Sequence, residues 1–346
     1  MRKVHLCSII LALAVSSVAF AQGRSINKIV NNNSLNEDEI QKIERYAEFW
    51  SNALETTDGK ALNKARVKLA DPLEPSVGMT AYARSIYGNA IKENTGKYLA
   101  KGNANEMAAV NALQVVSLLG TEEACTILLD HADIASENRS GFRLCSAIGL
   151  KNTFQIGLLD ARRIESIAKL IANFIKRESD WYTISRQFET LASIKSVPGL
   201  DKQSVEHMEE VSFGLQSATL LDLLNNISNG DSPNTKVQAL PIVLPSFLLQ
   251  FSEPGVNEGV QDDAKDTILP GLIAFVESST TQAPPLESNP TLNGSYKASV
   301  AIAALVINYI LEQNSDDSVS IVDFWENGNM DEIQECVLTW KKLSKN

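Results

Sequence analysis

A helical pattern that recurs every 37 residues places the strongest constraint on the fold of this chain. Residues of the same kind recur at this spacing in the pairs Leu113/Leu150, Gly120/Gly157, Ala124/Ala161, Ile127/Ile164, Ala108/Cys145, Ala109/Ser146 and Ala112/Gly149. Each copy predicts a helix with a stripe of small residues, a glycine stop and a second amphipathic helix. Such a unit cannot bury its apolar face alone, so copies stack on one another. We therefore expect stacked helical hairpins.

The rest of the chain also has helical rather than strand periodicity, which predicts an all-α fold. Apolar and polar residues do not alternate over any convincing strand, and no Asn-Gly or Asp-Gly turn joins two β-branched runs. Ser34 and Glu37 have the spacing of a capping box and predict a helix from there to about Glu55. Asp71-Pro72 predicts the end of the following helix.

Composition along the chain predicts four segments after a leader. The first, 22–102, is an N-terminal helical segment, and 103–278 contains the repeats. Residues 279–295 include three prolines among many Ser, Thr and Asn residues, which predicts a loop or linker. The last segment, 296–346, is expected to contain C-terminal helices.

The repeat resembles the HEAT-like family of helical repeats. Shorter members carry Val-Arg-x-x-Ala-Ala-x-Ala-Leu in the second helix, and here the stretch Phe142–Leu150 reads Phe-Arg-Leu-Cys-Ser-Ala-Ile-Gly-Leu. The preceding copy departs from the pattern, because Glu106 stands where the family has arginine. Leu240–Pro245 resembles the proline-bearing first helix of a longer HEAT unit, and Val260–Ala264 resembles its second helix. Over 103–278 the resemblance implies an α-solenoid, a fold whose extended surfaces bind other proteins.

The first 21 residues have the features of a secretory signal peptide. Arg2 and Lys3 give a basic start, a mostly apolar run follows, and Ala19-Phe20-Ala21 is a small-x-small cleavage site. We therefore predict an exported protein, periplasmic or secreted, that begins at Gln22 after cleavage. The other apolar run, Ala298–Leu311, is too short to cross a bilayer, which predicts a buried helix and no membrane span after cleavage.

Charge is concentrated in the second half of the chain. Without Arg2 and Lys3, 29 of the 31 basic residues remain against 42 acidic ones. Residues 181–346 hold 9 basic and 22 acidic residues, whereas 22–180 hold 20 of each. An acidic surface disfavours nucleic acid as a partner and favours a basic protein, although such a charge also serves solubility alone.

Three cysteines follow the leader, Cys125, Cys145 and Cys336. Cys125 and Cys145 are expected on neighbouring helices, where they could form a disulfide if their Cα atoms lie within about 7 Å. The alternative is that they are buried thiols that pack as small apolar side chains. No histidine lies near Cys336 in the sequence, so it lacks the local pattern of a catalytic nucleophile.

Asp130, His131 and Asp133 are the weak candidates for ligand residues. A histidine between two carboxylates could bind a metal or act as a base with its orienting partner. The alternative is a histidine that interacts with the dipole at the C-terminal end of a helix. The sequence has no His-Glu-x-x-His, Gly-x-Ser-x-Gly or phosphate-loop motif, so no catalytic residue and no cofactor is predicted.

Three hypotheses for function follow. The first is an exported helical-repeat protein that acts as a non-catalytic scaffold for another protein. The second is an enzyme or small-ligand binder whose site is assembled from residues distant in sequence. The third is a structural component of the cell envelope.

Overall fold

The structure is a computed structural model, and it describes residues 25–100, 105–230, 234–251, 253, 256–286, 288–312 and 316–345. These residues form fourteen α-helices and no strand, which confirms the all-α prediction. The predicted signal peptide lies outside the described residues.

The chain divides into two compact units, one ending at His131 and the other starting at Ala132. This boundary falls inside the predicted repeat segment 103–278. The first predicted helix pair therefore belongs to the first unit and the second pair to the second unit.

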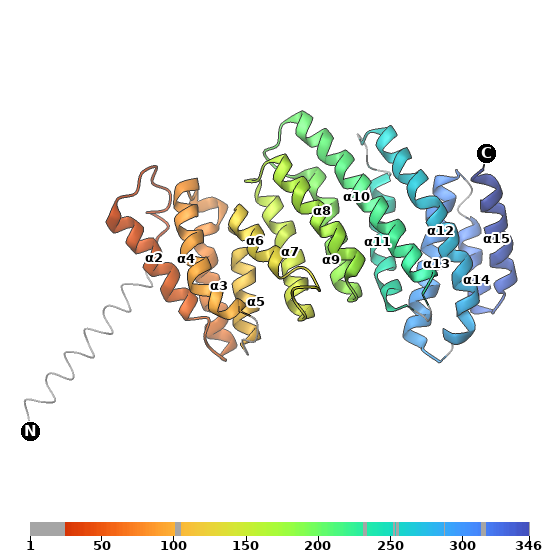
Figure 1. Cartoon of the computed structure of the whole chain (residues 1–346), viewed down its shortest axis with the longest axis horizontal. Coiled ribbons are helices and arrows are strands. Elements are labelled where there is room, and N and C mark those ends of the chain that lie inside the picture. Colours follow the sequence, from red (N-terminus) through yellow and green to blue (C-terminus); the bar gives the residue numbers. More distant parts are fainter. Residues whose placement is uncertain are drawn as a thin grey trace, which may run out of the picture. The chain divides into compact units, whose positions relative to one another are not determined.

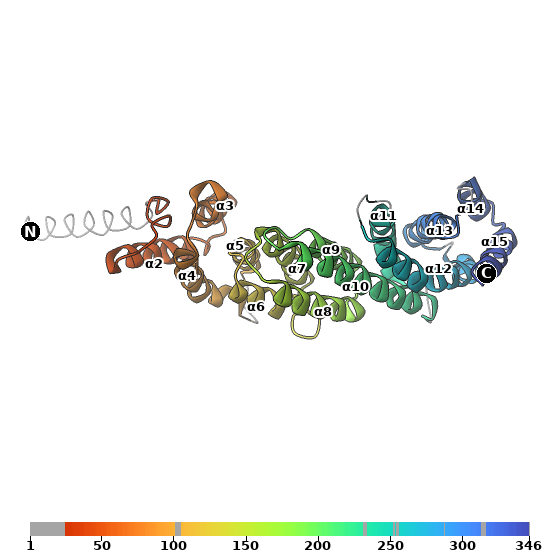
Figure 2. The same ribbon diagram turned by 90° about the horizontal axis from the view of Figure 1, so that it is seen from above.

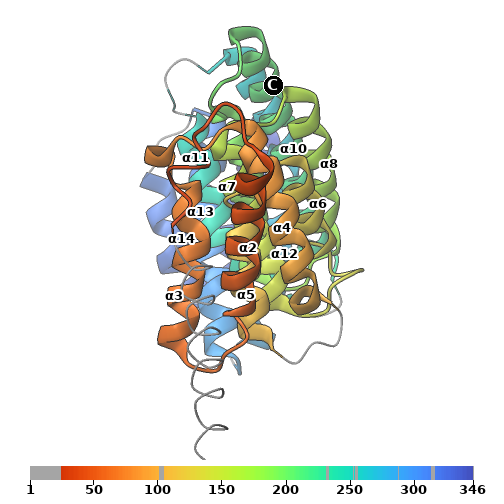
Figure 3. The same ribbon diagram turned by 90° about the vertical axis from the view of Figure 1, so that its left-hand side faces the viewer.

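The first unit contains five α-helices and two short 3-10 helices. They are α2 (Glu37–Asn52), α3 (Gly59–Ala70), η1 (Asp71–Leu73), η2 (Pro75–Val77), α4 (Ala81–Leu99), α5 (Glu106–Val116) and α6 (Glu122–Asp130). Helix α2 packs against α3 and α4, which lie on either side of it, and both of these contact α5 (Figure 3). The predicted helix end at Asp71-Pro72 is confirmed by η1.

The capping box of α2 lies two residues later than predicted. Asn36 is the N-cap, its side chain accepts a hydrogen bond from the backbone of Glu39, and the Glu39 carboxylate accepts one from the backbone of Asn36. Asparagine caps a helix as well as serine does, so the local pattern also allowed this later start.

Buried tyrosines tie the helices of the first unit together through their hydroxyls. Tyr46 and Tyr87 donate to the carbonyls of Lys68 and Leu69, at 2.5 and 2.8 Å. These carbonyls lie in the last turn of α3, where helix carbonyls lack partners within the helix. Burial raises the pKa of both phenols, so they remain hydrogen-bond donors at neutral pH.

The second unit contains nine α-helices and two 3-10 helices. They are α7 (Ser140–Ile156), α8 (Ala161–Arg177), α9 (Trp181–Ser193), η3 (Ile194–Ser196), α10 (Lys202–Ser228), η4 (Thr235–Ala239), α11 (Leu240–Phe251), α12 (Glu258–Leu286), α13 (Pro290–Ile310), α14 (Asp316–Glu326) and α15 (Met330–Leu343). Side chains that accept from the backbone cap several of these helices, for example Asp160 on α8, Asp180 on α9 and Asp201 on α10.

The helices of the second unit form two rows (Figures 1 and 2). In one row α7, α9, α11, α13 and α14 each contact the next helix. In the other row α8 contacts α10, α10 contacts α12, and α12 contacts α15. The core of the unit lies between the rows, where α9 contacts α8 and α10, and α13 contacts α12. This arrangement leaves the outer side of each row exposed.

The predicted glycine stop is confirmed at Gly157, the C-cap of α7, whereas α5 already ends at Val116, four residues before Gly120. Gly120 and Gly157 have φ angles of 68° and 73° and follow α5 and α7. This left-handed conformation suits glycine because it has no Cβ atom. At Gly157 a Cβ would also lie 2.5 Å from the carbonyl oxygen of Pro198.

The predicted loop over 279–295 is wrong. Helix α12 continues to Leu286 and α13 begins at Pro290, so only residues 287–289 separate them. Proline fits the first turn of a helix, and the side chain of Asn289 accepts a hydrogen bond from the backbone of Leu292. The hydroxyls of Ser279 and Thr280 donate to carbonyls of the preceding turn, so these polar side chains fit within the helix.

Candidate functional site

The three weak ligand candidates, Asp130, His131 and Asp133, lie at the point in the sequence where the first unit ends and the second begins. Asp130 and His131 end α6 in the first unit, whereas Asp133 belongs to the second. The carboxylate of Asp133 accepts hydrogen bonds from Arg177 at 2.6 Å and from the backbone of Ala135 at 3.1 Å. Within the described residues, no group of three or more His, Cys, Asp or Glu side chains could hold a metal ion.

Cys125 and Cys145 are thiols in the structure, so the predicted disulfide is not formed there. Cys125 is buried on α6 in the first unit, and Cys145 is half-buried on α7 in the second. Burial raises the pKa of the Cys145 thiol, which disfavours the reactive thiolate. Both thus fit the alternative interpretation of cysteine as a small packing residue.

A buried ion pair joins α7 to the end of α8, and a second, partly buried pair lies just before α7. Arg143 donates to both carboxylate oxygens of Glu178, at 2.7 and 2.9 Å, and to the carbonyl of Glu137 at 3.0 Å. Arg139 donates to both carboxylate oxygens of Glu137 at 2.7 Å. The guanidinium of each arginine is thus matched by a carboxylate in two-point geometry. We interpret this cluster as a structural junction, because its charges are paired with one another.

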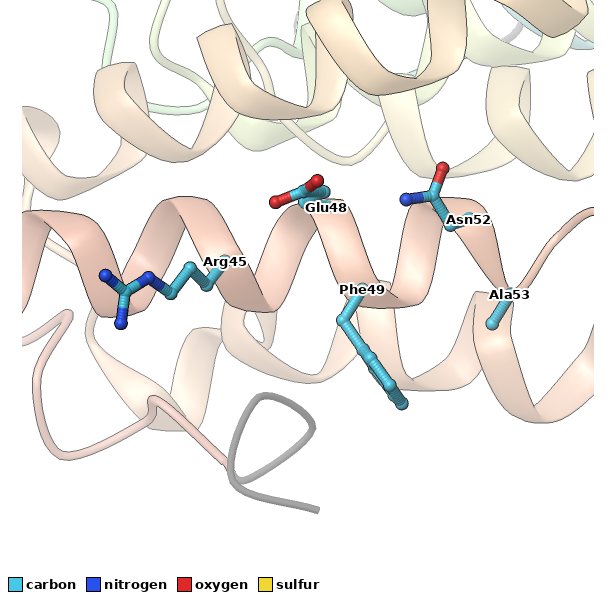
Figure 4. Close-up of a pocket in the computed structure, with 5 residues that line it drawn as sticks. All are labelled: Arg45, Glu48, Phe49, Asn52 and Ala53. Atoms are coloured by element: carbon cyan, nitrogen blue, oxygen red, sulfur yellow. The ribbon is translucent and has the colours of Figure 1, made fainter. Parts of the chain in front are cut away.

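A shallow depression of about 320 Å³ lies on α2 in the first unit. It is lined by Arg45, Glu48, Phe49, Asn52 and Ala53. These side chains are spread along a single helix and do not converge on one point (Figure 4). A ligand site needs a concave surface with convergent polar groups, so this depression does not have the form of an active site.

A second hollow, of about 600 Å³, lies between α12 and α15. Leu269, Pro270 and Ile273 contribute apolar surface, and Lys341 and Lys345 lie at its edge. The Lys341 ammonium forms an ion pair with Glu277 at 2.6 Å. This hollow is wide open to solvent, so it does not enclose a ligand as an active-site pocket does.

The outer side of α11 and α13 is the most distinctive surface of the second unit. Helix α11 has no charged residue along its length, and α13 has none from Ala298 to its end. Exposed or half-exposed apolar side chains follow one side of each helix at helical spacing. We call the set Ile242, Pro245, Leu249, Ile302, Leu305 and Tyr309 the apolar face.

The two helices lie side by side in the same row of the second unit (Figure 2). The Tyr309 hydroxyl donates to the carbonyl of Phe251 at 3.2 Å, and the two rings stack 6.3 Å apart. At the other end, the Ser299 hydroxyl donates to the carbonyl of Val237 at 3.3 Å. Val237, just before α11, thus lies beside the middle of α13, and the end of α11 lies beside the end of α13, so the two helices run in the same direction.

The exposed fractions on the apolar face are large for apolar residues. Leu249 is 71% exposed, Tyr309 41% and Leu305 39%. Single exposed apolar residues are common on protein surfaces, but a contiguous uncharged patch marks an interaction site more often. Although both helices are rich in apolar residues, no helix in the described part of the chain is long and apolar enough to span a membrane.

Sequence reasoning missed this face. It interpreted Ala298–Leu311 as a buried helix and Leu240–Pro245 as one half of a repeat. The signal that could have revealed it was the absence of charge from both segments, since a helix that is apolar on every side must be covered by something.

No protein-family model matches this chain, and no curated protein sequence is similar to it.

Proposed function

We propose that this protein is an exported, non-catalytic scaffold that binds another protein through the apolar face of its second unit. One observation carries the proposal: two parallel neighbouring helices present apolar side chains to solvent, and neither α11 nor α13 from Ala298 onward contains a charged residue. Burying such side chains against a partner removes apolar surface from water, which is the main driving force of association.

The fold part of this proposal is a HEAT-like α-solenoid. Two features support it: the rows of helices in the second unit, and the helix pairs α5–α6 and α7–α8, each with a left-handed glycine between its helices. Stacked helix pairs present long open surfaces, and proteins built in this way recognise partners without chemistry.

The export part of the proposal rests on the leader sequence. We expect the protein recovered from its source to begin at Gln22 and to be found outside the cytoplasm. N-terminal sequencing of the recovered protein tests this expectation, and an intact leader on cytoplasmic protein would contradict it.

Site-specific photo-crosslinking tests the binding function. A photoreactive residue at Leu249 on the apolar face should capture a defined protein in the natural extracytoplasmic fraction. The same residue at Leu338 on α15 is the matched control, because this leucine is 65% exposed but lies outside the apolar face. The captured protein is then identified by mass spectrometry, purified and titrated against this chain. Equal capture from both positions, or no saturable binding of the purified protein, would refute the function.

A further inference from the structure

We propose that the apolar face binds a basic amphipathic helix whose lysine or arginine residues gather at one end. This inference rests on the proposed function and names the chemistry of the partner. It is argued from the shape of the face, from the charges at its two ends and from the charge of the unit that carries it.

The apolar face has the form that receives a helix. Ile242, Pro245 and Leu249 are spaced by three and four residues along α11, and Ile302, Leu305 and Tyr309 have the same spacing along α13. From Ile242 to Leu249 the face extends about 10 Å along the helix axis. A helix packs on others by placing its ridges of side chains between theirs. An amphipathic helix can use apolar side chains at positions i, i+3, i+4 and i+7 for such packing.

Exposed carboxylates gather at one end of the face, where α11 and α13 finish and α12 starts. Glu253 follows α11, Glu312 follows α13, and Asp262 lies in the second turn of α12. The side chains of Glu253 and Asp262 are 51% and 67% exposed. The carbonyl ends of α11 and α13 add partial negative charge to this end.

The lysines near these carboxylates are less exposed than their acidic partners. Lys195, which pairs with Glu253, is 13% exposed, and Lys265, which pairs with Asp262, is 22% exposed. The Lys265 ammonium lies 6.0 Å from the ring centres of both Phe251 and Tyr309. The lysines thus lie beneath the surface while the carboxylates face solvent, so this end of the face attracts cations.

The opposite end of the face carries lysines and does not attract cations. Lys236 lies before the positive N-terminal end of α11, and Lys297 lies within α13, just before its uncharged part begins at Ala298. Lys297 pairs with Glu326 at 2.7 Å, and burial lowers the pKa of Lys236. A partner with basic residues along its whole length would place some of them against these lysines, and the like charges would repel one another. We therefore place the partner's basic residues at the end that lies over Glu253, Asp262 and Glu312.

Two other occupants fit the charges less well. A second copy of the chain would bring together two segments that each hold 22 acidic and 9 basic residues. An anionic membrane would be repelled by the same excess of carboxylates. Both remain outcomes that the experiment can detect.

The experiment measures binding of designed peptides to the protein from Gln22 to its C-terminus. One peptide is an amphipathic helix of about five turns with leucines along one side and four lysines near its N-terminal end. Two others have the same leucines, with glutamate or glutamine in place of the lysines. Fluorescence anisotropy gives the dissociation constant of each. We expect the lysine peptide to bind at least tenfold more tightly than either of the others, and to weaken several-fold as salt rises from low to physiological concentration.

Variants of the protein locate the binding. Leu249→Glu and Leu305→Glu should each weaken the lysine peptide at least tenfold, whereas Leu338→Glu on α15 should leave it unchanged. Glu253→Gln combined with Glu312→Gln should weaken the lysine peptide and leave the glutamine peptide unchanged. The control for the lost charges is Asp331→Asn combined with Glu332→Gln, which removes two exposed carboxylates from α15.

The outcomes separate this inference from the proposed function. If all three peptides bind equally and Leu249→Glu weakens each, the face is a docking site but the basic partner is wrong. If no peptide binds, the basic partner is also wrong, and the crosslinking at Leu249 decides the function independently. If the protein sediments as a dimer and Leu249→Glu dissociates it, the apolar face binds a second copy of the chain. If the protein binds phospholipid vesicles and Leu249→Glu abolishes that binding, the face binds a membrane. Either result would contradict the basic helix.

Discussion

Arg143 on α7 and Glu178 at the end of α8 form a two-point ion pair that is almost excluded from solvent. Their side chains are 4% and 1% exposed, and the nitrogen–oxygen distances are 2.7 and 2.9 Å. The Glu178 carboxylate also accepts hydrogen bonds from the backbone of Ser179 and Asp180, at 2.8 and 3.0 Å. The pair therefore fixes the turn from α8 into α9 against the start of α7.

Removing one partner of this pair should strongly destabilise the protein. In Arg143→Met the Glu178 carboxylate stays buried without its counter-charge, and we expect the free energy of unfolding to fall by about 3–5 kcal/mol. Urea unfolding followed by circular dichroism measures the change. The double variant Arg143→Met/Glu178→Leu should recover most of the loss, because it leaves no isolated buried charge.

The matched control is the exposed pair between Lys176 and Asp222, whose side chains are 48% and 47% exposed. Lys176→Met should change the free energy of unfolding by less than about 1 kcal/mol. Equal effects of Arg143→Met and Lys176→Met would show that the burial of the first pair has no energetic consequence.

The helices were predictable from sequence because their signals are local. Apolar spacing, helix breakers such as Pro72 and glycine stops such as Gly157 act over a few residues, and each was interpreted correctly. The capping box at Ser34 and Glu37 was misplaced by two residues, because Asn36 and Glu39 offer the same chemistry. These signals do not specify which helices become neighbours.

The helical structure of 279–286 and the exposure of the apolar face could not be predicted from sequence, because tertiary contacts decide both. The sequence Ser278–Thr281 favours a loop by composition, but it lies in a helix that packs against α10, α13 and α15. The hydroxyls of Ser278 and Thr281 donate hydrogen bonds to the helix backbone, so these polar residues cost little stability when the segment is helical. Likewise, the sequence of α13 suggests burial on all sides, and only the positions of its neighbours leave Leu305 and Tyr309 uncovered.

Gly157→Ala should destabilise the protein although alanine is generally the better helix residue. The φ angle of 73° disfavours a Cβ, and the added atom would lie 2.5 Å from the backbone oxygen of Pro198. We expect the free energy of unfolding to fall by about 2 kcal/mol or more. Gly214→Ala is the control, because Gly214 lies within α10 and an added Cβ there would meet no neighbouring atom within 4 Å, so this variant should gain about 0.5–1 kcal/mol. The same sign for both substitutions in urea unfolding would contradict this account.

The pKa of Glu165 should respond more to Lys169 than to His207. Glu165 accepts hydrogen bonds from Lys169 at 2.7 Å and from His207 at 3.0 Å, and these two partners lower its pKa, Lys169 first. Lys169→Met should therefore raise the pKa of Glu165 more than His207→Ala does. Carbon-13 NMR titration of the glutamate side chains measures both, and the reverse order would refute the assignment.

The contact between Glu165 and Lys169 also determines the direction in which the stability of the protein changes with pH. A carboxyl whose pKa is lower in the folded state than in the unfolded state adds stability above its unfolded pKa, and this stability is lost as the pH falls through the folded pKa. Lys169→Met should therefore lose less stability than the wild type on acidification over this range. A steeper loss in the variant, measured by thermal unfolding at a series of pH values, would be inconsistent with a lowered pKa.

Cys145 should react slowly with thiol reagents in the folded protein. Burial raises the pKa of its thiol, so a smaller fraction is thiolate at pH 8, and the thiolate is the reacting form. We expect alkylation by iodoacetamide to be at least tenfold slower in the folded protein than in urea, as measured by peptide mass spectrometry. If Cys145 stays unmodified in urea until a reductant is added, it forms a disulfide and the thiol assignment is wrong.

Substitutions on the two sides of α11 should separate stability from binding. Phe247 is 1% exposed and its ring packs 4.9 Å from that of Phe251, so Phe247→Ala should lower the free energy of unfolding by about 3–5 kcal/mol. Leu249 is 71% exposed two residues later, so Leu249→Glu should change it by no more than about 0.5 kcal/mol. Urea unfolding of the two variants measures this contrast. A large loss in Leu249→Glu would mean that the side chain is already covered within the folded chain, and the apolar face would not be available to a partner.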